Sequence, residues 1–203
     1  MNRSLLARVG RSILRRPFPV IGAFALVGAL PAREVAAADA TSPHHELNEQ
    51  VQTGELVRIV REATERFKDV EVAKKEGYGL LFGCVSGDAS GAMGLHFVNL
   101  ALVGDPTLDP TRPEIVIYEP RPGGGVKLIG ADFIVFKADW DALHPNETPQ
   151  IMGQLLHLFE SPNRFGLPDF YTLHVWAWKD NPTGTFVNWH SKVSCDAFSG
   201  QTP

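Results

Sequence analysis

The 203-residue sequence predicts an α+β domain, in which an N-terminal amphipathic helix packs on a mostly antiparallel β-sheet and one disulfide ties the fold. Three observations support this fold class. Apolar residues recur with helical spacing after Gly54, and short β-type runs separated by Gly, Pro and Asp follow Tyr78. Two cysteines lie downstream of an export-type leader. Because the helical part precedes the strands, the order favours α+β over an alternating α/β fold.

The helical segment presents one apolar stripe, while Glu, Arg and Lys occupy the opposite face. Asp69 is a good N-cap residue, and Gly77 is a good C-terminal stop. The helix is therefore predicted to break near Lys68, with a second short helix ending at Gly77. The stripe consists of Leu56, Ile59, Val60, Ala63, Phe67 and Val70.

Five strands are predicted from runs of β-branched, aromatic and other apolar residues. The prolines and glycines at 120–125 predict a hairpin loop between the third and fourth strands. The segment 149–159 is predicted to be a short helix or irregular. The strands are expected at 80–85, 94–103, 114–119, 126–136 and 170–178.

Residues 1–40 have the pattern of a signal peptide. Arginines precede an apolar run at 18–30, and Ala38-Asp39-Ala40 fits the cleavage rule. The run is too short and too interrupted for a spanning helix. Arg15-Arg16-Pro17-Phe18 also fits a twin-arginine signal. The sequence thus predicts a periplasmic or extracellular protein with a mobile lead-in at 41–53 and a single domain at 54–203.

The net charge of the chain without its leader limits the classes of macromolecule that it can bind. Removal of the leader takes away six arginines and two acids, which leaves 13 basic and 21 acidic side chains and a formal charge near −8. An acidic surface repels phosphate backbones and anionic lipid. We therefore expect no nucleic-acid partner and no stable membrane association after cleavage. The oligomeric state stays open.

Cys84 and Cys195 are the two cysteines of the chain. In an oxidising compartment such a pair is expected to form a disulfide, here closing a loop of more than a hundred residues. The alternative is a catalytic thiolate at Cys84. A catalytic thiolate needs a neighbouring base to lower its pKa, and the sequence places none nearby.

Histidines are the most promising candidates for a functional site. Alternation along the strand at 170–178 puts His174, Trp176 and Trp178 on one face, so that two indoles flank an imidazole. A His/Trp-lined pocket of this kind suits a metal or a haem-type ligand.

Two further histidines are candidate partners of His174. His96 comes from the strand at 94–103, and His157 lies in an apolar segment. If the three converge, they form a nitrogen-rich site for copper, zinc or non-haem iron, with Glu119 as a carboxylate ligand. The alternative is that each histidine is a hydrogen-bonded core residue, since no metal-binding or haem-binding spacing is present.

Five short motifs, taken together, resemble a family of short exported bacterial proteins of uncharacterised function. The resemblance covers most of residues 63–195. It implies export and a single domain, and it implies no activity. The motifs are Gly91-Ala92-Met93-Gly94-Leu95-His96, Leu108-Asp109-Pro110, Tyr118-Glu119-Pro120, Leu173-His174-Val175-Trp176 and Asn181-Pro182-x-Gly184-x-Phe186.

Three functions are consistent with the sequence. The first is an exported binding protein that holds a metal or haem-type ligand in the histidine pocket. The second is a metal-dependent enzyme that activates oxygen or water at the same histidines. The third is a structural or interaction protein without a small-molecule site. Binding ranks first because no acid/base or nucleophile–base spacing stands out.

Overall fold

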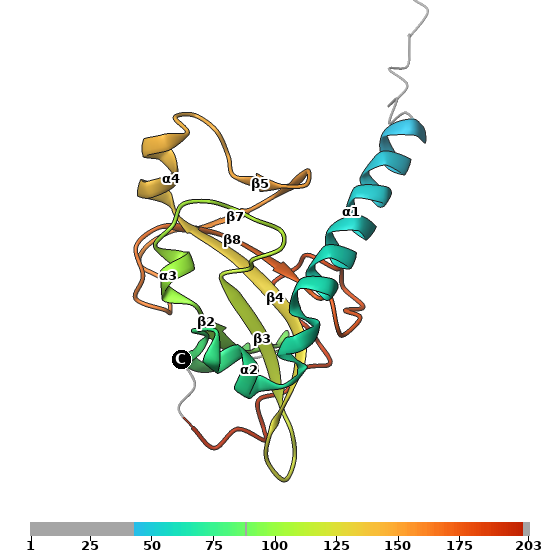
Figure 1. The fold of residues 1–203 in the computed structure, drawn as a ribbon, viewed down its shortest axis with the longest axis vertical. Helices are drawn as coiled ribbons and strands as arrows, with labels where there is room; N and C mark the ends of the chain where they lie inside the picture. The colour runs from blue at the N-terminus through green and yellow to red at the C-terminus, as the bar shows by residue number, and fades with distance from the viewer. Residues whose placement is uncertain (1–42, 88, 201–203) are drawn as a thin grey trace, which may run out of the picture. The chain divides into compact units, whose positions relative to one another are not determined.

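The computed structural model describes residues 43–87 and 89–200, with side chains from residue 50 onward (Figure 1). The predicted signal peptide at 1–40 lies outside the described residues. Within the described part, no helix is both long and apolar enough to cross a membrane.

Three helical segments precede the sheet. They are α1 (Pro43–Thr64), a 3-10 turn η1 (Glu65–Lys68) and α2 (Val70–Lys75). The Asp69 carboxylate accepts a hydrogen bond from the Glu71 amide at 3.0 Å and caps α2, as its sequence position predicts. Helix α1 begins before Gly54, so it includes most of the segment that the sequence assigns to a lead-in.

The main sheet has six strands in the order β1-β2-β3-β4-β8-β7, and every neighbouring pair is antiparallel. The fold is therefore α+β with a curled antiparallel sheet, as predicted. Its strands are β1 (Gly79–Gly87), β2 (Gly91–Val98), β3 (Ile115–Pro120), β4 (Val126–Phe136), β7 (His157–Phe159) and β8 (Phe170–Val175).

The hairpin loop between β3 and β4 is confirmed, because the Arg121 amide donates to the Gly125 carbonyl at 3.0 Å. Two other predictions were wrong. The second strand ends at Val98, since the Asn99 side chain accepts from the Ala101 amide and caps the short helix α3 (Leu100–Val103). The segment 149–159 forms strands instead of the predicted short helix or irregular segment. They are the hairpin of β5 (Gln150–Ile151) and β6 (Gln154–Leu155), followed by β7. The remaining helix is α4 (Lys137–Leu143).

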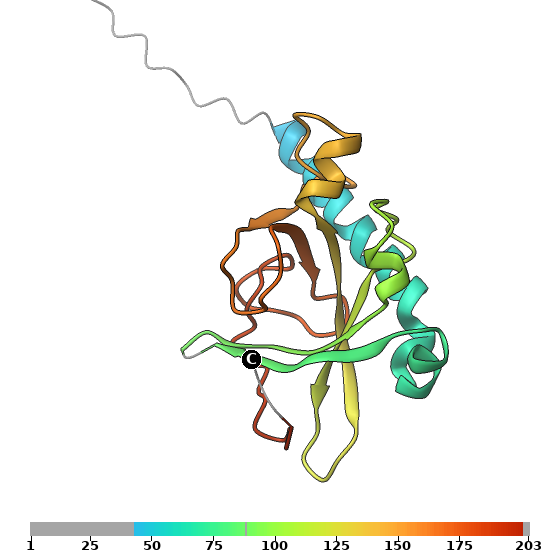
Figure 2. The same ribbon diagram turned by 90° about the vertical axis from the view of Figure 1, so that its left-hand side faces the viewer.

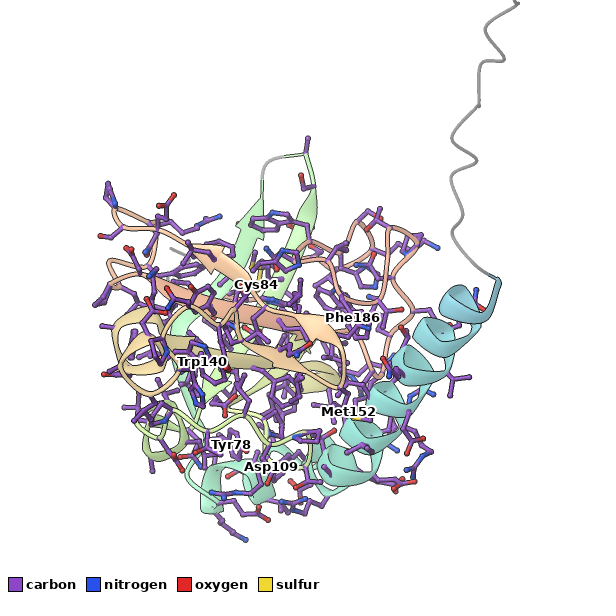
Figure 3. All side chains as sticks on the ribbon, turned by 90° about the horizontal axis from the view of Figure 1, so that it is seen from above. Tyr78, Cys84, Asp109, Trp140, Met152 and Phe186 are labelled. Carbon is purple, nitrogen blue, oxygen red and sulfur yellow. A yellow bond between two sulfur atoms is a disulfide. The ribbon has the colours of Figure 1, made fainter. Side chains whose placement is uncertain are left out.

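Helix α1 covers one face of the sheet. Leu56 and Val60 are fully buried in a cluster with Phe133 of β4 and Leu173 of β8. Figure 2 shows α1 on one side of the strands and the irregular C-terminal segments on the other. Partly buried side chains complete the helix-side cluster, among them Met152 and Phe186 (Figure 3).

The opposite face of the sheet packs against irregular structure. There Ile134 of β4 and Phe170 of β8 share a second cluster with Trp176 and Val193. Because side chains alternate along a strand, Phe133 faces α1 while Asp132 and Ile134 face away from it. This second face carries the candidate site.

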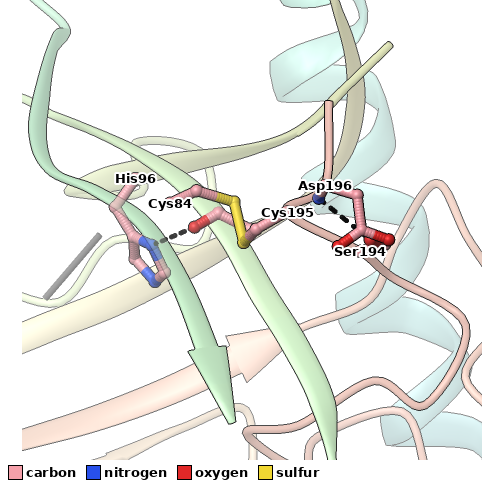
Figure 4. The surroundings of a disulfide bond; sticks show 6 residues. Cys84, His96, Ser194, Cys195 and Asp196 are labelled. Atoms are coloured by element: carbon pink, nitrogen blue, oxygen red, sulfur yellow. Dashed lines mark hydrogen bonds between the residues drawn. A yellow bond between two sulfur atoms is a disulfide. The ribbon is translucent and has the colours of Figure 1, made fainter. Parts of the chain in front are cut away.

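The Cys84–Cys195 disulfide is confirmed. Its Cα atoms are 5.8 Å apart, and it joins β1 to the C-terminal segment across 111 residues (Figure 4). Because both cysteines of the chain are bonded, Cys84 has no free thiol, and the alternative of a catalytic thiolate is excluded in this form.

We expect the double variant Cys84→Ala/Cys195→Ala to lose about 3 to 5 kcal/mol of unfolding free energy, because the bridge closes a loop of 111 residues. Urea unfolding of wild type and variant without reductant measures the loss. Wild type treated with reductant should move to the same midpoint as the variant. A shift below about 1 kcal/mol would mean that the bridge does not stabilise the fold.

Candidate functional site

Asp132 and His174 are cross-strand neighbours on the face opposite α1. Strand β4 pairs with β8 so that Asp132 lies directly opposite His174. Both side chains are buried, with 3% of their surface exposed. The Thr172 hydroxyl donates to Asp132 Oδ1 at 2.6 Å and satisfies one acceptor site of that oxygen. A buried acid–imidazole pair is thus built into two central strands.

His96 reaches the pair from β2, although β3 lies between β2 and β4 in the strand order. Three strand spacings of about 4.8 Å would separate His96 from β8 in a flat sheet. The sheet curls, and two glycines permit the close backbone approach. A Cβ on Gly94 would lie 2.6 Å from the Tyr118 carbonyl, and one on Gly130 would lie 2.6 Å from the Val175 carbonyl. The curl therefore brings His96 to His174.

The two imidazole rings face each other through their Nε2 atoms, which are 3.4 Å apart. The Nδ1 atom of His174 lies 3.5 Å from Asp132 Oδ1, beyond ordinary hydrogen-bond length, and has no hydrogen-bond partner. One ligand atom from each of His96, Asp132 and His174 lies within 4.8 Å of the others. This is the set of residues that can hold a metal ion in the described part of the chain.

The proton position on His96 follows from its surroundings. Its Nδ1 lies 3.2 Å from the Gly94 carbonyl oxygen. A carbonyl only accepts hydrogen bonds, so Nδ1 carries the proton of the neutral ring and Nε2 carries the lone pair. Metal-binding histidines are held in this way, with the far nitrogen donating to a carbonyl or carboxylate.

With respect to His96 and Asp132, either tautomer of neutral His174 leaves two acceptors opposed. With its proton on Nε2, His174 donates to His96, but its Nδ1 lone pair then faces the Asp132 carboxylate. With its proton on Nδ1, it faces Asp132 favourably, but the two Nε2 lone pairs oppose each other at 3.4 Å. A cation bound by both Nε2 atoms removes the conflict.

Burial disfavours a proton as the cation, because it disfavours the charged form of both imidazoles. It lowers the pKa of His96 to about 4, and the charge of His174 adds to that shift. Burial also lowers the pKa of His174 to about 3, reinforced by the charge of His157 and opposed by hydrogen bonding with the Asn188 side chain. The pKa of Asp132 rises to about 6 because of burial, against the effect of the Thr172 hydroxyl. At neutral pH the site therefore holds two neutral imidazoles and an ionised carboxylate.

A cavity of about 40 Å³ adjoins the three side chains. Apart from the three and Thr172, its lining is hydrophobic. The hydrophobic lining residues are Phe82, Met93, Ile115, Ile134, Phe159, Phe165, Leu167 and Phe170.

The structure brings together two of the four predicted ligands, His96 and His174. His157 lies at an exposed position on the edge strand β7, opposite Thr172 in the register, and is not part of the three-residue group. Glu119 is paired elsewhere, because the Lys179 ammonium donates to both of its carboxylate oxygens at 2.7 and 2.8 Å.

The predicted tryptophan wall needs correction. Trp176 packs beside His174, with ring centroids 6.0 Å apart, but phenylalanines line the cavity instead of tryptophans. Trp178 lies on the other face, where its indole donates to the Thr64 hydroxyl at 2.9 Å. Alternation fails at Trp178 because β8 ends at Val175.

Asp132 was missed at the sequence level. The available signal was a lone acid inside the apolar run 126–136, since an acid at a buried strand position needs a polar partner. Glu114 gives a similar signal at the start of β3. It is 2% exposed, and its Oε2 accepts from the Ile134 amide at 3.1 Å.

Comparison with known proteins identifies no relative of this chain. No protein family, no curated protein and no solved structure matches this chain. The function must therefore be argued from the site itself.

Glu114 generates a pH prediction. Burial raises its pKa from 4.5 to about 8, so between these values the folded state binds more protons than the unfolded state and stability falls as pH rises. Glu114→Gln keeps the acceptor for Ile134 without the charge. We expect its stability gain over wild type to grow from roughly 1 kcal/mol at pH 5 to roughly 4 to 5 kcal/mol at pH 9.

Urea unfolding of both proteins in a chelating buffer at pH 5, 7 and 9 measures this difference. Glu147→Gln is the matched control, because Glu147 is exposed, and its stability should follow wild type at each pH. A gain for Glu114→Gln that does not change with pH would show that the carboxyl is not held neutral in the fold.

Proposed function

We propose that this protein binds one divalent transition-metal ion through His96 Nε2 and His174 Nε2, with the Asp132 carboxylate as the third ligand. The observation that carries the proposal is the pair of facing imidazole nitrogens, because neither tautomer of His174 suits both His96 and Asp132. A metal ion accepts both lone pairs and attracts the carboxylate.

The spacing of the nitrogens supports the proposal. Two metal–nitrogen bonds of about 2.05 Å at a tetrahedral angle place their nitrogens about 3.3 Å apart. The observed Nε2–Nε2 distance is 3.4 Å. Imidazole and carboxylate together suit zinc, iron, copper and cobalt better than magnesium or calcium.

The size of the cavity favours a bare ion over a haem-type ligand. Sites for organic cofactors usually enclose about 300 Å³ or more. The cavity beside the histidines is about 40 Å³. A porphyrin would require the aromatic lining to be displaced.

The test is a Co²⁺ titration of chelator-treated protein, followed by visible absorption. We expect one equivalent to bind and to give ligand-field bands typical of nitrogen–oxygen coordination. His96→Asn and His174→Asn should each weaken binding at least about 100-fold, and Asp132→Asn about 10- to 100-fold. His144→Ala is the matched control, because His144 lies at the C-terminal end of α4 outside the three-residue group, and its affinity should equal that of wild type.

Circular dichroism of each variant checks that it is folded. A second measurement uses wild type alone: a bound ion should raise the melting temperature in proportion to the logarithm of its concentration. Folded wild type that takes up no stoichiometric metal by either measurement would refute the proposal. It would favour the structural or interaction role.

We further propose that the protein works outside the cytoplasm. The leader pattern of residues 1–40 and the Cys84–Cys195 disulfide support this, because structural disulfides persist in oxidising compartments.

Intact-mass measurement of protein recovered from the native cell envelope or medium tests export. We expect the mass of residues 41–203 less two hydrogens for the disulfide. A full-length mass, or a mass with two free thiols, would contradict the proposal. Replacement of Ala38 and Ala40 by bulky residues should block the cleavage and serves as the control.

A further inference from the structure

An ion held by His96, Asp132 and His174 has three protein groups around it. Structural zinc sites usually have four protein ligands, whereas sites with three keep a position for an external ligand. In the part of the chain that the structure describes, no fourth His, Cys, Asp or Glu joins the group. Three protein ligands would therefore leave one coordination position of the ion open to an external ligand.

The surroundings of that position restrict what can occupy it. The cavity is about 40 Å³, which is enough for one or two molecules of the size of water. The Thr172 hydroxyl already donates its hydrogen bond to Asp132. Apart from Thr172 and the three ligand residues, the side chains that line the cavity are hydrophobic. An anion placed there would lose its hydration without gaining a hydrogen-bond donor.

Several half-buried side chains line the cavity, and two of them come from separate parts of the chain and pack together. Phe82 of β1 packs against Phe165, with ring centroids 5.4 Å apart, and both line the cavity. Phe82 has a φ of 64°, unusual for a bulky residue, at a bulge where the β1–β2 register shifts between Leu81 and Cys84. A strained backbone thus places this ring at the cavity.

We infer that the metal site binds a neutral diatomic molecule of the dioxygen and nitric oxide class at its open position, admitted between Phe82 and Phe165. This inference rests on the proposed metal site. It adds the class of ligand and the residues that control access. Size excludes larger organic ligands, and the apolar lining disfavours anions such as azide.

The probe is nitric oxide added to anaerobic protein loaded with one equivalent of Fe²⁺. We expect the electron paramagnetic resonance signal of a half-integer-spin iron–nitrosyl species, in stoichiometric amount. Azide added to the Co²⁺-loaded protein tests exclusion. We expect no change in the wild-type visible spectrum at an azide concentration that fully converts Phe165→Ala.

Access is tested by stopped-flow mixing with nitric oxide. Phe82→Gly and Phe165→Ala should each accelerate binding at least about five-fold, since each removes one ring that lines the cavity. Glycine at position 82 adopts the positive φ without strain, so that variant should fold. Phe186→Ala is the matched control: Phe186 packs against the helix-side cluster, and its rate should equal that of wild type.

The outcomes separate the two proposals. Failure to load Fe²⁺ or Co²⁺ would refute the metal site and this inference with it. Stoichiometric loading without a nitrosyl signal would leave the metal site standing and refute the diatomic ligand. Azide binding to wild type as tight as to Phe165→Ala would refute exclusion of anions, and unchanged rates in both ring variants would refute the entry path.

Discussion

The alternation of side chains along β4 determines how both faces of the sheet are built. Phe133 faces α1 and packs with Leu56 and Val60, so its neighbour Asp132 must lie on the opposite face, inside the protein. A carboxylate there needs polar partners. Strand β8 supplies them in register, as Thr172 donates to Asp132 and His174 lies across from it. The site is thus a consequence of strand pairing as well as of the residue types.

The disulfide and the bulge of β1 contribute to the sheet face that carries the candidate site. Cys84 is fully buried and anchors β1 to the C-terminal segment, close to where the register with β2 shifts. The shift changes the direction of the strand at Phe82, whose ring lines the cavity, while Cys84 two residues on is held by the disulfide. Phe82 thus lies in a bulge whose two ends are fixed, by pairing of Leu81 with His96 on one side and by Cys84, which pairs with Leu95 and forms the disulfide, on the other.

Local patterns in the sequence predicted the local features of the fold. Helical periodicity, the Asp69 cap, the loop at 120–125 and the cysteine pair each depend on neighbouring residues or on the chemistry of one residue type. The site depends on strand order. Histidines 96 and 174 were credible candidates, but nothing in the sequence shows that β8 pairs with β4 or that the sheet curls enough to bring β2 to β8. Local patterns indicate neither the pairing of Glu119 with Lys179 nor the position of Asp132 opposite His174, because both are long-range contacts.

The energetics of the cluster argue against a purely structural role. Burial of His96, Asp132 and His174 removes three polar groups from water, and Asp132 and His174 do not reach hydrogen-bond distance. Hydrophobic side chains of similar volume would fill this face without that cost, as they do on the helix side of the same strands. Polar groups that lower stability and remain imperfectly paired are typical of sites that acquire a further partner. A metal ion at the facing nitrogens is the partner that would satisfy all three groups at once.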